Sequence, residues 1–214
     1  MTEAVVHVVD DEAEVCNAIA MLLRSVGLQS RTYGSAQAFL EGFRPGAPGC
    51  IVLDVRLPGM SGLELQERLQ QSGISLPVIV MTGHGDIQMA VRAMRAGALD
   101  FVEKPFNDQT LLDRVHEGIA RSMQSRDADG ERAQVQCRYE SLSEREREIL
   151  GHVVDGRPNK LIADELGLST RTVESHRAHI IEKMQASSLS HLVRMAVMVL
   201  PNVAASAKRT RRSR

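Results

Sequence analysis

The fold is decided by one stretch, Cys50-Ile51-Val52-Leu53-Asp54-Val55-Arg56-Leu57-Pro58-Gly59. Its first four residues are apolar and rich in branched side chains, which is typical of a buried parallel strand, and Pro58-Gly59 ends the run. Asp54 closes the strand. A carboxylate is costly there unless it binds or reacts with something, although an acid that caps a turn explains this stretch equally well on its own.

Similar apolar segments recur through the first half of the chain, with helical periodicity between them. Strands are predicted at residues 5–9, 28–33, 50–54, 77–81 and 100–103, and helices at 14–26, 35–43, 61–71, 86–96 and from about 108 onward. This alternation predicts an α/β, flavodoxin-like, doubly wound domain with five parallel strands in the order 2-1-3-4-5.

Polar residues stand at the carboxyl ends of four of these strands: Asp10 and Asp11, Asp54, Thr82 and Lys104. Such ends meet at one edge of the sheet, where ligands bind. The three carboxylates would repel one another, and Mg²⁺ suits them because it takes a few carboxylates and keeps several waters. A carboxylate beside Mg²⁺ can act as the nucleophile in phosphoryl transfer, with Lys104 as a positive charge and Thr82 as a hydroxyl donor. Ordinary turn acids and a snorkelling lysine remain the alternative for each residue taken singly.

Charge divides the chain into two halves. Residues 1–140 carry 13 Lys and Arg against 19 Asp and Glu, and residues 141–214 carry 13 against 8, so the net charges are −6 and +5. The basic half is the candidate for binding a phosphate backbone. No apolar run is long enough to span a membrane, and three cysteines without metal spacing suit reduced thiols in the cytoplasm.

The second half is predicted to be helical. Its first helix opens with a capping box, Ser143-Glu144-Arg145-Glu146. Further helices are predicted at residues 159–166, 170–184 and 190–200. Gly167-Leu168-Ser169 forms the tight turn of a helix-turn-helix.

The helix predicted at 170–184 has two distinct faces. Val173, Ile180 and Met184 share one stripe, which is assigned to the core. The outward and flanking positions are the candidates for the major groove: Arg171, Glu174, Ser175, Ala178, His179 and Glu182. Glu174 can accept from a cytosine amino group and Arg171 can reach guanine or a phosphate, but without the fold context simple solvation explains a polar face better. Candidates for phosphate contacts are Lys160, Thr172, Arg177 and Lys183.

Residues 3–124 resemble response-regulator receiver domains. The resemblance is carried by Val8-Val9-Asp10-Asp11-Glu12, Asp54 with Leu57-Pro58-Gly59-Met60-Ser61-Gly62, Met81-Thr82-Gly83-His84-Gly85, and Gly97-Ala98-Leu99-Asp100-Phe101-Val102-Glu103-Lys104-Pro105-Phe106. It implies that Asp54 accepts a phosphoryl group from a sensor histidine kinase. It also implies a Mg²⁺ site made of Asp10, Asp11, Asp54 and the Arg56 carbonyl. Two further implications are a cis bond between Lys104 and Pro105, and movement of Thr82 and Phe101 on phosphorylation.

Residues 142–205 resemble the LuxR-type DNA-binding domain, on the motifs Leu142-Ser143-Glu144-Arg145-Glu146-Arg147-Glu148, Thr172-Val173-Glu174 and Ser188-Leu189-Ser190-His191-Leu192. The whole chain is similar to two-component response regulators of the FixJ/NarL family, and to FixJ-type members in particular. The expected organisation is a receiver domain at 3–124, a linker at 125–141, the DNA-binding domain at 142–205 and a basic tail at 206–214.

The hypothesis is a cytoplasmic transcription factor that is no enzyme apart from its own phosphorylation and slow dephosphorylation. Phosphorylation of Asp54 is expected to draw Thr82 inward and move Phe101. As a result, either a homodimer forms or the DNA-binding half is released, and the protein binds double-stranded promoter DNA, with RNA polymerase as a further partner. The expected dimer face includes Val91, Arg95 and Glu103. Two alternatives stay open: DNA binding that ignores phosphorylation, and a Mg²⁺-dependent aspartyl-phosphatase or phosphate sink, which a DNA-binding half argues against.

Overall fold

The computed structural model describes residues 3–83 and 87–200, so the predicted basic tail lies outside the described residues. The chain divides into two compact units, Met1–Arg126 and Asp127–Arg214. No described helix combines the length and the apolar character needed to cross a membrane.

The first unit is built on a sheet of five parallel strands in the predicted order, β2-β1-β3-β4-β5. The strands are β1 (Val5–Val9), β2 (Gln29–Tyr33), β3 (Gly49–Asp54), β4 (Val78–Thr82) and β5 (Asp100–Glu103). The helices that connect them are α1 (Ala13–Ser25), α2 (Ala36–Gly42), α3 (Gly62–Gln71) and α4 (Ile87–Arg95), and α5 (Asp108–Glu140) follows the last strand.

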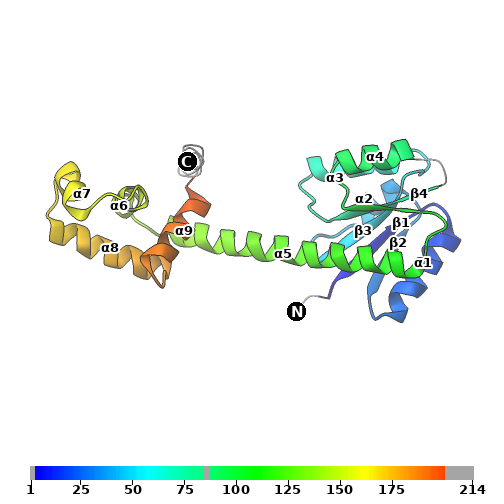
Figure 1. The fold of residues 1–214 in the computed structure, drawn as a ribbon, viewed down its shortest axis with the longest axis horizontal. Helices are drawn as coiled ribbons and strands as arrows, with labels where there is room; N and C mark the ends of the chain where they lie inside the picture. Colours follow the sequence, from blue (N-terminus) through cyan, green and yellow to red (C-terminus); the bar gives the residue numbers. More distant parts are fainter. Residues whose placement is uncertain (1–2, 84–86, 201–214) are drawn as a thin grey trace. The chain divides into compact units, whose positions relative to one another are not determined.

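Helices cover both faces of this sheet. On one face α1 and the first part of α5 pack against Cys50 and Val52, and on the other α2, α3 and α4 pack against Ile51 and Leu53 (Figure 1). Side chains alternate between the faces along each strand, so a central strand needs apolar residues at successive positions. Every residue of β3 is buried, and Asp54 therefore reaches the edge of the sheet on a rigidly packed strand.

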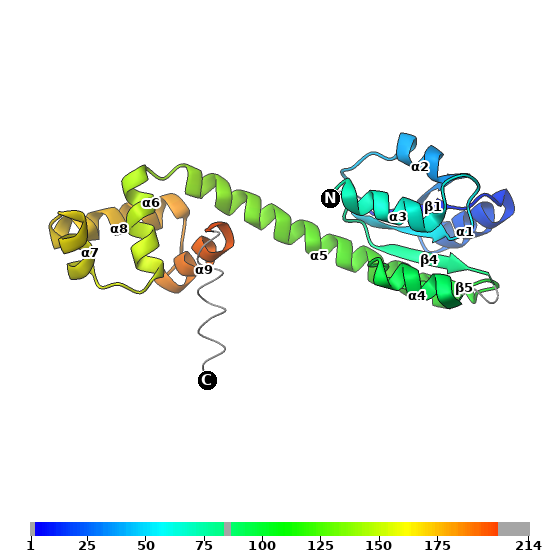
Figure 2. The ribbon, with the colours of Figure 1, turned by 90° about the horizontal axis from the view of Figure 1, so that it is seen from above.

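The second unit packs four helices around one core: α6 (Glu144–Val154), α7 (Asn159–Leu166), α8 (Thr170–Met184) and α9 (Leu189–Val199). Within it α6 contacts both α8 and α9, and α7 contacts α8 (Figure 2). The predicted capping box is confirmed: the Glu146 N–H donates to Ser143 Oγ (3.3 Å), and the Ser143 N–H donates to Glu146 Oε2 (2.8 Å).

The segment predicted as a linker, residues 125–141, is mostly helical. α5 runs from Asp108 to Glu140. Val135 is 2% exposed and packs, with Tyr139 one turn later, in the core of the second unit. The segment that precedes Val135, residues 124–134, contains Glu, Arg, Gln and Ala, which favour a helix even where they are exposed to solvent. The predicted segment is thus helical almost throughout, and the domain boundaries themselves stay predictions.

Candidate acidic site and nucleic-acid interface

Three carboxylates meet at the carboxyl edge of the sheet. Asp10 follows β1 directly, where its N–H donates to the Tyr33 carbonyl (3.1 Å), and Asp54 is the last residue of β3. Ligand oxygens of Asp10, Asp11 and Asp54 all lie within 4.8 Å of one another. Asp10 is fully buried, Asp54 is 6% exposed, and Asp11 faces solvent. The structure therefore brings together the three acids that the sequence proposed as one site.

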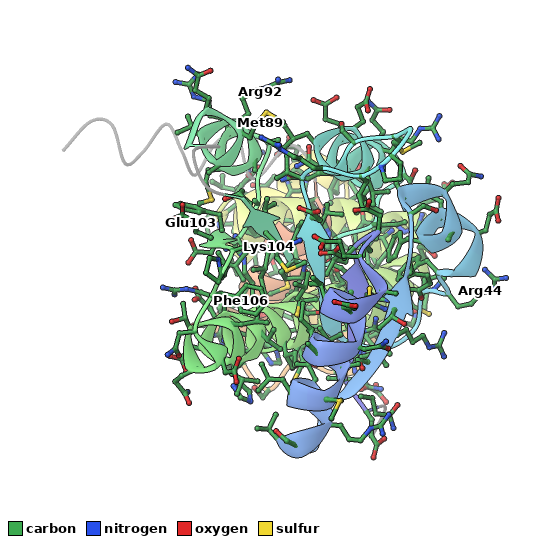
Figure 3. All side chains as sticks on the ribbon, turned by 90° about the vertical axis from the view of Figure 1, so that its right-hand side faces the viewer. Arg44, Met89, Arg92, Glu103, Lys104 and Phe106 are labelled. Carbon is green, nitrogen blue, oxygen red and sulfur yellow. The ribbon has the colours of Figure 1, made fainter. Side chains whose placement is uncertain are left out.

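Lys104 reaches this cluster from the end of β5. Its N–H donates to the Thr82 carbonyl (2.7 Å), which fixes the backbone beside β4. Its Nζ lies 2.7 Å from Asp10 Oδ2 and 3.4 Å from Asp54 Oδ2. Figure 3 shows Lys104 near the middle of this edge, with Glu103 farther out. The expected cis bond between Lys104 and Pro105 is present.

Glu12 is a fourth acid at the site, and the sequence analysis gave it no role. Its N–H donates to Asp10 Oδ1 (2.9 Å), and its Oε1 lies 3.6 Å from Lys104 Nζ. The only signal in the sequence was its place directly after Asp10 and Asp11.

Burial and charge oppose each other at Asp54. Burial raises the pKa of the Asp54 carboxyl above its usual range, Lys104 lowers it, and Asp10 raises it again. Burial alone would lower the pKa of the Lys104 ammonium, but its contacts with Asp10 and Asp54 outweigh burial and raise the pKa. Lys104 is therefore held as a cation beside a carboxylate whose charge is costly.

The donor set of this site fits Mg²⁺. The available ligand atoms are carboxylate oxygens, and three carboxylates against the single Lys104 ammonium leave negative charge for a hard divalent ion to neutralise. The Arg56 backbone N–H donates to the Asp54 carboxylate. Use of the Arg56 carbonyl as a further ligand stays a prediction.

The residues proposed to respond to phosphorylation lie on the neighbouring part of the sheet. Thr82 ends β4 and is 3% exposed, whereas Phe101 on β5 is 46% exposed. Phe101 pairs with Val80 and Glu103 with Thr82, so both project on the face that α4 covers. On α4, Val91 is 45% exposed and Arg95 is also exposed. The expected dimer residues Val91, Arg95 and Glu103 are therefore all exposed, and their use as a dimer face stays a prediction.

The second unit contains the predicted helix-turn-helix, α7 and α8. Gly167 ends α7 in the left-handed region (φ 64°), where glycine carries no steric penalty. Ser169 then caps α8, its Oγ accepting from the Thr172 N–H (3.0 Å). Val173, Ile180 and Met184 are completely buried. The predicted outward positions are all exposed: Arg171, Glu174, Ser175, Ala178, His179 and Glu182.

Three of the four proposed phosphate contacts are engaged inside the unit. Arg177 Nη1 donates to Asn159 Oδ1 and so ties α8 to the start of α7. Thr172 Oγ1 shares a hydrogen bond with Ser169 Oγ (2.7 Å). Lys183 Nζ donates to Glu146 Oε2 (2.7 Å), whereas Lys160 is exposed. A DNA role for all four residues stays a prediction.

Beyond the predicted capping box, Glu146 makes a buried contact with Lys183 that the sequence did not reveal. Its residue is 4% exposed, and its carboxylate accepts from Lys183 and Ser143. Burial alone would raise the pKa of this carboxyl, but these hydrogen bonds and the Lys183 charge outweigh burial and lower the pKa from 4.5 to about 2. Lys183 and Glu146 are 37 residues apart, and no local pattern connects them.

Comparison with protein families assigns both units. Residues 6–116 match the response regulator receiver domain, and residues 140–196 match the bacterial regulatory proteins of the luxR family. The chain is similar to the transcriptional regulatory protein FixJ of Azorhizobium caulinodans, with 48% identity over 193 residues, 90% of this chain and 92% of the relative. It is also similar to the response regulator protein TmoT of Ectopseudomonas mendocina, with 42% identity over 193 residues, 90% and 88% of the two chains.

Solved structures agree with these matches. The response regulator StyR has a TM-score of 0.81 and 42% identity, covering 91% of this chain and 98% of that one. Full-length FixJ from B. japonicum has a TM-score of 0.58 and 40% identity, covering 93% and 98%.

Proposed function

This chain belongs to the response regulators that join a receiver domain to a LuxR-type DNA-binding domain, and we propose that phosphorylation of Asp54 switches its activity as a transcriptional regulator. The observation that carries the proposal is the setting of Asp54. Its buried carboxylate ends a rigid strand, two further acids lie within 4.8 Å, and Lys104 Nζ lies 3.4 Å away.

The proposed reaction transfers a phosphoryl group from a phosphohistidine of a sensor kinase. An Asp54 carboxylate oxygen attacks phosphorus, the P–N bond breaks with its electron pair left on the histidine, and an acyl phosphate forms. Asp10, Asp11, Asp54 and the Arg56 carbonyl would hold Mg²⁺, which supplies positive charge for the phosphoryl oxygens. Lys104 supplies a second positive charge when it shifts from the carboxylates to the phosphoryl group. Slow hydrolysis of the acyl phosphate resets the protein.

The proposed switch runs through Thr82 and Phe101. The Thr82 hydroxyl turns toward the new phosphoryl oxygens, and the exposed Phe101 ring moves into the space that this leaves beside β4. Burying an aromatic ring that is 46% exposed favours the second state. The surface formed by Val91, Arg95 and Glu103 changes with it and binds a second copy of the chain.

The proposed dimer acts on promoter DNA in the cytoplasm. Two α8 helices would occupy successive major grooves roughly one helical turn apart. Glu174 accepts from a cytosine amino group, and Arg171 contacts guanine or a phosphate. RNA polymerase is the further proposed partner. The exposed face of α8 also supports a second candidate, DNA binding that does not depend on phosphorylation.

The deciding experiment measures DNA binding and oligomeric state with Mg²⁺ and acetyl phosphate, for the wild type and Asp54→Asn. Dimers and tighter DNA binding in the wild type alone support the switch. Equal DNA binding by both proteins supports the second candidate. Acyl-phosphate turnover without any DNA binding would point instead to a phosphate sink.

A further inference from the structure

Gly62, the first residue of α3, lies directly against the backbone of Asp54. The Gly62 N–H donates to the Val55 carbonyl (3.0 Å), one residue beyond Asp54. Ser61 caps the same turn of α3, accepting from the Glu64 N–H while Glu64 Oε2 accepts from the Ser61 N–H (2.8 Å). The first turn of α3 is therefore docked on the end of β3 and held there by its own cap.

No side chain larger than hydrogen fits at this contact. A Cβ on Gly62 would lie 2.1 Å from the Asp54 carbonyl oxygen, 3.0 Å from the Asp54 carbonyl carbon and 3.1 Å from Val55 Cα. All three are backbone atoms, so no rotamer change relieves the overlap. Gly62 does not lie in the left-handed region, so the requirement is for space and not for an unusual backbone conformation.

Both sides of the contact resist movement. The Val55 N–H donates to the Met81 carbonyl (3.1 Å), which ties the end of β3 to β4. On the other side, α3 is anchored by buried Leu65 and by Gln66 Nε2, which donates to the Ala93 and Ala96 carbonyls of the α4 region (3.1 and 2.7 Å). An added methyl group therefore moves part of the Asp54 backbone as well as α3.

We propose that Gly62 is a positioning residue for phosphorylation of Asp54, because its missing side chain lets α3 set the backbone from which the carboxylate projects. This inference rests on the proposed function. Attack on phosphorus requires the carboxylate oxygen in line with the leaving group, and a displacement of about 1 Å costs on the order of 10²-fold in rate.

The test compares Gly62→Ala with Gly34→Ala in the full chain. Gly34 is a matched control in the same unit, because a Cβ there meets nothing within 4 Å and its backbone is not left-handed. With acetyl phosphate, an Asp54 oxygen attacks phosphorus, the P–O bond breaks, and acetate leaves with the electron pair. The Asp54 acyl phosphate is followed by intact mass over a range of acetyl phosphate concentrations at saturating Mg²⁺, and thermal unfolding is recorded for each protein.

The expected result for Gly62→Ala is a maximal rate lowered at least tenfold with a KM for acetyl phosphate within about twofold of the wild type. Gly34→Ala should phosphorylate like the wild type. A Gly62→Ala rate within twofold of the wild type overturns the inference and leaves the proposed function standing. Asp54→Asn should gain no phosphoryl group. If the wild type also gains none, both the inference and the proposed function are overturned.

A second variant separates positioning from general damage. Ser61→Ala removes the hydroxyl that accepts from the Glu64 N–H and so weakens the cap of α3. In the double variant with Gly62→Ala the first turn of the helix can therefore yield in place of the Asp54 backbone. We expect the double variant to phosphorylate faster than Gly62→Ala, and to regain a fold if Gly62→Ala alone has lost it. A purely structural role predicts that two destabilising changes add. A double variant that is no faster, or that does not fold, overturns the inference.

Discussion

Replacing Glu146 by glutamine tests how strongly the buried contact with Lys183 stabilises the second unit. The pKa of Glu146 falls from 4.5 to about 2 in the folded protein, which corresponds to an upper limit of about 3 kcal/mol at about 1.4 kcal/mol per pKa unit. Lys183 is 43% exposed, so water screens the pair, and we expect about 1–2 kcal/mol at pH 7. In a unit of this size that lowers the melting temperature by about 5–10 °C.

The lowered pKa also predicts how the stabilisation by Glu146 changes with pH. A carboxyl whose pKa is lowered by folding contributes its stability above the unfolded value of 4.5, and that contribution is lost as the pH falls from 4.5 toward 2. Glutamine does not titrate, so Glu146→Gln has no such loss of stability at low pH. The difference in melting temperature between the wild type and Glu146→Gln should therefore be largest above pH 5 and shrink below pH 4.

Glu148→Gln is the matched control on the same helix. Its carboxylate pairs with Arg145 (2.6 Å) on the surface, and such an exposed pair is worth at most about 0.5 kcal/mol. Thermal unfolding of the three proteins between pH 7 and pH 3, followed by circular dichroism, measures both effects. Equal melting temperatures of wild type and Glu146→Gln at pH 7, or a difference that persists unchanged at pH 3, would refute the reasoning.

Three further predictions concern the first unit, the dimer face and the tail. Burial, helped by the charge of Arg31, lowers the pKa of His7 from 6.5 to about 4, so the first unit should lose stability as the pH falls from 6.5 toward 4. If the melting temperature of a His7→Leu variant falls with pH as steeply as that of the wild type, His7 is not the cause. Val91→Glu should leave phosphorylation of Asp54 unchanged and abolish phosphorylation-dependent dimers, and dimers that persist in light scattering rule out this interface. Deleting residues 206–214 should flatten the dependence of DNA affinity on salt, whereas an unchanged slope shows that the tail releases no counterions.

The acidic site was predictable because its signals are local. The apolar run of β3 ends in Asp54, and parallel strands bring their carboxyl ends to one edge of the sheet. The sequence alone therefore assigns Asp10, Asp11 and Lys104 to the same site as Asp54. The buried and exposed faces of α8 were also predictable from the sequence, because a period of 3.6 residues separates Val173, Ile180 and Met184 from the exposed positions. Capping at Ser143 depends on residues three apart and was confirmed for the same reason.

Other features depended on which elements pack together. Val135 of α5 lies in the core of the second unit, and the polar residues around it gave no sign of that contact in the sequence. The contact of Lys183 with Glu146 depends on the packing of α6 against α8, and no local pattern in the sequence indicated it. The sequence analysis gave Gly62 no role of its own, and only the docking of α3 shows that there is no room there for a methyl group.

The sequence by itself determined the order of the elements, the acidic edge and the outward face of α8, because each follows from a short repeat or a strand end. Only the tertiary structure decided which charges are already paired and which glycine is needed for space. Those properties depend on distances between residues far apart in the chain, and they exist only once the elements have packed.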